Sequence, residues 1–184
     1  MRYAEIGLRC LLGLVFLVSS VSKMSRRGSF RSFKGSLLDT GLLSRSLAGP
    51  AAVCVVTGEI AIWVSLAIPL ESAGIFGFGL SAGMLAVFAV GILMTVRRGV
   101  GVPCRCFGAS VTPLGMRHVG RNLLLAAGGV CGIVSVTSPG QVATAGAALA
   151  ACCGVVLGGL VAVLDDIFEL FRPAPKVSRT RAAR

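Results

Sequence analysis

Five long apolar runs, separated by short polar intervals, constrain this chain more than any other feature. Apolar residues make up 55% of its 184 residues and charged residues only 14%. Runs of about 18 or more apolar residues with few charges are long enough to cross a bilayer as helices. A soluble core could not bury so much apolar surface behind so few charges. The sequence therefore predicts an all-α, polytopic membrane bundle over residues 1–164, with spans at 6–22, 50–69, 72–96, 119–137 and 142–164, and a polar, disordered tail at 165–184.

The formal net charge of +11 is distributed unevenly between the intervals. One side of the membrane receives six basic residues of the interval 23–49, four of the interval 97–118 and five of the tail. The other side receives the N-terminus and two short turns. Because basic residues favour the cytoplasmic side, we expect an outside N-terminus and a cytoplasmic C-terminus in the plasma membrane. The expected partner of these charges is the anionic surface of the lipid bilayer, not nucleic acid.

The basic interval 23–49 carries apolar residues at three- and four-residue steps between Phe30 and Leu42. This spacing is typical of an amphipathic helix that lies on the membrane surface. Three glycines interrupt the pattern, and a flexible basic loop explains the composition equally well. Both interpretations stay open at this point.

Three residues within the apolar runs break their pattern. Arg9 lies one turn inside the first run, where its side chain can reach the interface. Pro50 is well placed to begin the second helix. Glu59 lies near the middle of the second run, where a charge is costly and normally faces a partner, water or a site. It is therefore either a functional residue or a protonated side chain that is hydrogen-bonded to a neighbouring helix.

Small residues recur in the last run at every fourth position, which places them on one face of a helix. Such a stripe is typical of close helix packing in membranes, and we predict no other role for it. Its members are Gly146, Ala150, Gly154, Gly158 and Ala162.

The chain has seven cysteines, and five of them lie within the apolar runs. The other two, Cys104 and Cys106, lie in the polar interval 97–118 with the cation Arg105 between them. Two cysteines in a loop can form a redox couple if one is a thiolate and the other attacks the mixed disulfide. A disulfide between such close cysteines is strained and therefore easily reduced. We expect nearby arginines to lower the pKa of the thiols.

Three other interpretations of this pair remain open. The thiols can be free and inert, they can form a structural clip, or they can bind a metal together with His118. A structural zinc site needs four ligands, and the interval holds no third cysteine, so we predict no metal. The one histidine of the chain has no acidic neighbour in the interval, which argues against Ser/His/Asp catalysis.

The segment around these cysteines contains a motif of Cys104, Cys106, Phe107 and Gly108, followed by Arg121 and Asn122. This motif resembles that of the MauE family of methylamine utilisation, which is related to DoxX. Lys23 at the end of the first run and Glu59 in the second also match the family pattern. The resemblance covers about residues 1–137. Arg105 departs from it, because a small residue is expected between the two cysteines.

The resemblance implies a four-helix DoxX/MauE-like core, to which the fifth run of this chain adds a helix. It also implies thiol redox chemistry with a thioredoxin-like protein or a client redox enzyme, and maturation of a disulfide-bearing protein. DoxX relatives are linked to quinone-coupled oxidoreductases, so a quinone is the one cofactor that the resemblance suggests.

Together, these features predict a membrane thiol-disulfide oxidoreductase that uses Cys104 and Cys106. Two alternatives are a non-enzymatic assembly factor and a quinone-linked membrane subunit of DoxX type. In this hypothesis Arg121 and Asn122 hold the thiol loop against the bundle. Glu59 supplies a buried proton or a polar anchor, and we expect Arg121 to point inward and meet it, directly or through Asn122 or a water. The alternative is that Arg121 extends outward to lipid phosphate while Glu59 is protonated and isolated.

Overall fold

The computed structural model describes residues 1–25, 28–99, 115–138 and 143–170, with side chains in the last range up to residue 164. These residues form helices and turns, and no strand occurs among them. Five helices are long and apolar enough to cross a membrane, which confirms the prediction of an all-α multi-pass membrane protein. They are α1 (Arg2–Met24), α3 (Arg45–Ala67), α4 (Glu71–Arg97), α5 (Met116–Val136) and α6 (Thr144–Leu170). A short helix, α2 (Ser29–Asp39), lies between α1 and α3.

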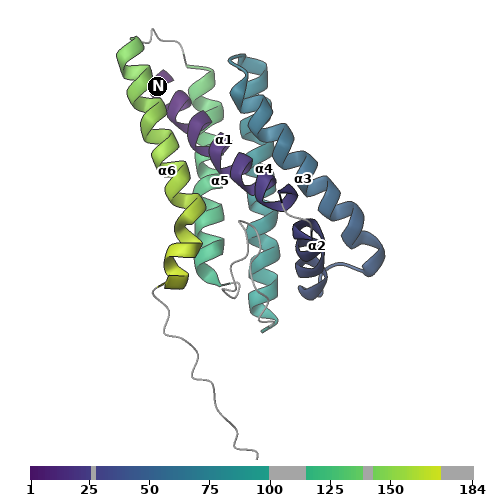
Figure 1. The fold of residues 1–184 in the computed structure, drawn as a ribbon. Helices are drawn as coiled ribbons and strands as arrows, with labels where there is room; N and C mark the ends of the chain where they lie inside the picture. Colours follow the sequence, from purple (N-terminus) through teal and green to yellow (C-terminus); the bar gives the residue numbers. More distant parts are fainter. Residues whose placement is uncertain (26–27, 100–114, 139–142, 171–184) are drawn as a thin grey trace, which may run out of the picture.

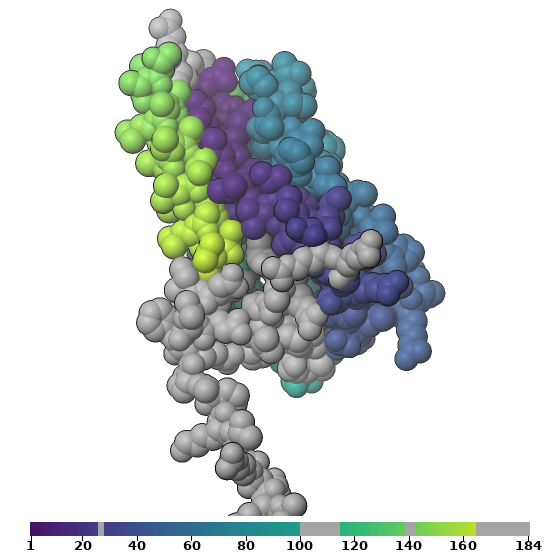
Figure 2. All heavy atoms as spheres, viewed as in Figure 1, coloured from purple at the N-terminus to yellow at the C-terminus, as the bar shows by residue number. Residues whose placement is uncertain are grey.

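Helix α1 crosses the front of the bundle between α6 and α3, and α4 and α5 lie behind it (Figures 1 and 2). It packs against α3, α5 and α6, while α4 packs against α3 and α5. The short helix α2 packs against the last part of α1 and against α3. This arrangement makes α1 the central helix of the bundle.

The main apolar core joins α1, α3, α4 and α5, and α6 contributes only a partly buried side chain to its edge. Burial of large side chains on four helices fixes their relative positions. The buried members are Leu12, Val15, Phe16, Ile62, Leu66, Phe78, Leu85, Leu125 and Val136.

Close contact between α4 and α5 depends on glycine. A Cβ atom at Gly132 would lie 2.5 Å from the Phe78 ring, and one at Gly129 would lie 3.0 Å from the Phe78 carbonyl oxygen. These glycines on α5 therefore make the space that the buried Phe78 ring of α4 occupies. Small residues commonly allow membrane helices to approach in this way.

Helix α6 packs on α1 through the small-residue stripe, as predicted. A Cβ at Gly158 would lie 2.8 Å from the Leu11 carbonyl oxygen, and one at Gly146 would lie 2.5 Å from the Tyr3 ring. At Gly154 a Cβ would overlap the Gly7 carbonyl oxygen. The two backbones are therefore in direct contact.

Several element boundaries differ from the sequence prediction. Helix α3 begins at Arg45, so Pro50 lies inside the helix rather than at its start. Proline removes one backbone hydrogen bond there, which neighbouring groups in membrane helices can compensate. For the basic interval 23–49, both a helix and a flexible loop were open, and the structure forms the helix α2 there. Helix α6 continues to Leu170, beyond the expected end at 164, and residues 171–184 lie outside the described part.

Arg9 connects α1 to the end of α3. Its guanidinium donates hydrogen bonds to the carbonyl oxygens of Leu66, Ile68 and Leu70 at 3.3, 2.6 and 3.1 Å, and its Nε lies 3.0 Å from Glu5 Oε1. The last carbonyls of a helix have no partner within the helix, and a cation near them is favourable. Arg9 therefore caps α3 instead of only reaching toward the interface.

Candidate functional site

A buried ion pair between α1 and α3 is the most polar feature of the described interior. Lys23 Nζ lies 2.7 Å from Glu59 Oε1, and the two side chains are 3% and 2% exposed. Ser19 Oγ donates to the same carboxylate oxygen at 2.8 Å and accepts a hydrogen bond from Lys23 Nζ at 2.6 Å. A charge inside a membrane protein is costly unless it is paired. Each charged member of this cluster therefore depends on the other.

The helical repeat explains how these side chains meet. Ser19 and Lys23 are four residues apart on α1, so they lie on the same face of the helix. Glu59 belongs to the buried face of α3, together with Ala52, Val56 and Ile62. Because α1 packs against α3, the polar positions of the two buried faces come together.

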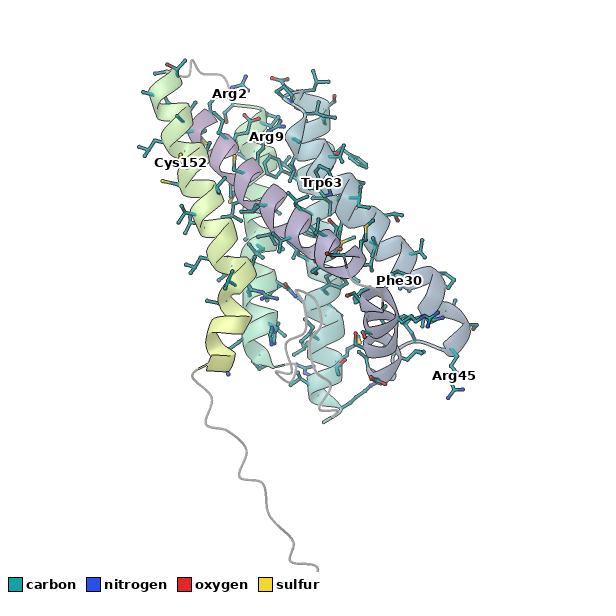
Figure 3. The ribbon with its side chains drawn as sticks, viewed as in Figure 1. Arg2, Arg9, Phe30, Arg45, Trp63 and Cys152 are labelled. Atoms are coloured by element: carbon teal, nitrogen blue, oxygen red, sulfur yellow. The ribbon has the colours of Figure 1, made fainter. Side chains whose placement is uncertain are left out.

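Helix α2 covers this ion pair. Phe33 is 4% exposed, and its ring centroid lies 5.0 Å from Lys23 Nζ. A cation over an aromatic ring is attracted to its negative face, more strongly when water is excluded. Phe33 therefore provides an apolar cover that still stabilises the Lys23 charge. Figure 3 shows α2, where Phe30 is labelled, below the end of α1.

A second polar cluster lies on α5. His118, Arg121 and Asn122 are 7%, 9% and 5% exposed, and their spacing of three and four residues places them on one face. Arg121 is therefore buried and does not extend outward to lipid. Its burial, like that of Asn122, fits an inward-facing role near the start of α5.

The expected pairing of Glu59 with Arg121 is wrong. Within the described residues, the one ion pair of Glu59 is with Lys23. The reason is tertiary: Glu59 is on the face of α3 that packs against α1, whereas Arg121 belongs to α5. Of the predicted site residues, the structure thus brings Lys23 and Glu59 together. It adds Ser19 and Phe33, which are not among the predicted site residues.

The predicted thiol loop joins α4 to α5. Cys104, Arg105, Cys106, Phe107 and Gly108 lie outside the described residues, so their roles stay predictions. The helices that carry the loop pack against one another, with α4 ending at Arg97 and α5 beginning at Met116.

A family model described as "Methylamine utilisation protein MauE" matches residues 1–136. The chain belongs to the MauE family. The match ends at the last residue of α5, so it covers the four-helix core and α2, while α6 lies outside it. This agrees with the predicted MauE-like core plus a fifth helix. Comparison with curated proteins and with solved structures found no match.

Within the MauE core, the two site residues that were not predicted differ in the signal that the sequence gives for them. Ser19 precedes Lys23 by one helical turn, which is a signal for a shared polar face once Lys23 is assigned to the helix. Phe33 is one of the regularly spaced apolar residues of the basic interval. No local signal, however, showed that Phe33 would lie on Lys23.

Proposed function

We propose that this MauE-family protein is a membrane thiol-disulfide oxidoreductase that acts through Cys104 and Cys106. Its partner is a thioredoxin-like protein or a client redox enzyme, and the reaction supports maturation of a disulfide-bearing protein. The observation that carries the proposal is the Cys-x-Cys motif in the MauE-matched part of the chain. A thiol pair beside a cation and outside the apolar runs has the surroundings of a reactive pair rather than a packing pair.

The exchange conserves electrons and sulfur bonds. A thiolate of the client attacks the Cys104–Cys106 disulfide, forms a mixed disulfide with one cysteine and releases the other as a thiolate. The second client thiolate then attacks the mixed disulfide. The client gains a disulfide, and this chain keeps two electrons as a dithiol. An oxidised thiol carrier accepts these electrons when it reoxidises the pair. On this proposal Arg121 and Asn122 hold the loop against the bundle.

Substitution of Cys104 and Cys106 by serine tests this function. Each single variant is expected to abolish maturation of the client, because one cysteine alone cannot complete the exchange. The measurement is the fraction of oxidised client in cells, with Cys131→Ser as control, since Cys131 is a free cysteine on α5. The single variants should also trap a mixed disulfide with the partner. Normal client oxidation in both variants would favour an assembly factor without redox activity.

Exposed cations suggest how the protein is oriented in the plasma membrane. Arg31, Arg45, Arg97 and Arg98 are exposed near the thiol-loop ends of their helices, and Figure 3 shows Arg45 projecting away from the bundle. At the other end, Arg2 and Arg9 pair with Glu5, and Arg2 also pairs with Glu71. We propose that the end with the four exposed arginines faces the cytoplasm and its anionic lipids.

Thiol labelling in intact cells tests this orientation. In a background without other cysteines, a membrane-impermeant maleimide should label Ser72→Cys, which is at the start of α4, from outside. It should not label Ser44→Cys, at the start of α3, or the Cys104/Cys106 pair after mild reduction. Both control positions are exposed. The opposite pattern would reverse the topology and place the thiol loop outside.

A further inference from the structure

Within the described part of the chain, Glu59 uses one of its two carboxylate oxygens in protein hydrogen bonds. Its Oε1 accepts hydrogen bonds from Lys23 and Ser19. Its Oε2 is buried, and no hydrogen-bond partner for it occurs among the described residues. An ionised carboxylate accepts hydrogen bonds at both oxygens, and buried polar atoms nearly always have a protein or water partner. Oε2 therefore needs a donor.

Trp63 presents the complementary group. Its indole Nε1 is also buried, and the part of the chain that the structure describes contains no acceptor for it. The indole N–H is a donor only. The Trp63 side chain packs against the apolar core, so the ring is held in place.

The helix places these two atoms in the same region. Trp63 follows Glu59 by four residues on α3, so their Cβ atoms are about 6 Å apart on one face. Long side chains in helices point back over the preceding turn. Helix geometry therefore directs the Trp63 side chain toward the turn of α3 that carries Glu59.

We propose that one water molecule binds between Nε1 of Trp63 and Oε2 of Glu59. Water fits because it can accept from the indole N–H and donate to the carboxylate at the same time. Internal waters in proteins typically bind such otherwise unsatisfied polar groups. This water donates a hydrogen bond to Oε2 of Glu59 without adding a charge to the site. It extends the Lys23–Ser19–Glu59 cluster by one turn along α3.

The sequence provides a specific reporter, because Trp63 is the only tryptophan in the chain. Ultraviolet resonance Raman spectroscopy of the full chain in lipid nanodiscs reads the hydrogen-bond state of that one indole N–H. The wild type is expected to show a bonded N–H. In the double variant Lys23→Met/Glu59→Leu, which removes the carboxylate without leaving a lone charge, the marker band should shift toward the free N–H position.

A control and a second measurement make the test decisive. Ser20→Ala should leave the band unchanged, because the Ser20 hydroxyl donates to Leu17 within α1. A high-resolution map of the wild type should show water density within hydrogen-bond distance of both atoms, whether or not the double variant folds. A free N–H in the wild type, a bonded N–H that persists in the double variant, or a direct Nε1–Oε2 contact in the map would each overturn the proposal.

Discussion

Replacement of Lys23 by methionine is expected to lower the free energy of unfolding by about 3–5 kcal/mol, the usual range when one member of a buried ion pair is removed. The substitution leaves the Glu59 carboxylate buried at 1% exposure, with Ser19 as its one remaining hydrogen-bond partner among the described residues. Glu59→Leu should cost a similar amount, because it leaves the Lys23 ammonium without its carboxylate. Reversible unfolding in mixed micelles, followed by fluorescence of the single tryptophan, measures both changes.

A double variant distinguishes an interacting ion pair from two charged residues that contribute to stability independently. Lys23→Met/Glu59→Leu removes both charges together, so its loss of stability should be much smaller than the sum of the two single losses. Arg121→Gln combined with Glu59→Leu is the matched control, because Arg121 does not pair with Glu59 in this structure. Its effect should add to that of Glu59→Leu. Additive losses for Lys23 and Glu59 would show that the ion pair is not made in the folded protein.

The fold class could be predicted from the sequence because the length of an apolar run is a local property. The helix boundaries were harder to predict from the sequence. The residues from Arg45 to Gly49 are too polar or small to mark a membrane span, yet they continue the backbone hydrogen bonds of α3. The same limit left α2 as one of two open interpretations, because glycines at 28, 35 and 41 weaken the helical pattern of the interval, while in the structure α2 packs against α1 and α3.

The ion pair shows which part of a site the sequence cannot provide. A carboxylate in the middle of an apolar run identifies Glu59 as unusual by itself. Its partner depends on which helices pack together, and that is a tertiary property. The sequence pattern places Lys23 among the basic residues of the interval 23–49, whereas α1 continues to Met24 and α2 covers the lysine. The thiol pair remains a prediction from its motif and its family.

Packing of α6 on α1 depends on a direct contact between backbones, which has a further testable consequence. A Cβ at Gly154 would overlap the Gly7 carbonyl oxygen and lie 2.9 Å from Cys10 Cβ. A backbone group cannot move aside as a flexible side chain can, so a larger residue must separate the two helices. Gly154→Leu is therefore expected to cost at least about 3 kcal/mol, the upper part of the range for overpacked cores.

The expected result of Gly154→Leu is that α6 separates from α1 while the other four membrane helices stay folded, because the main core lies among α1, α3, α4 and α5. A short bis-maleimide should join cysteines placed at Tyr3 and Gly146, which are in contact in this structure, and the yield should fall sharply when the Gly154→Leu substitution is added. Gly159→Leu is the control, since nothing lies within 4 Å of a Cβ at Gly159, and it should leave both yield and stability unchanged. Equal yields for the two leucine variants would mean that α6 does not pack on α1 through its small-residue stripe.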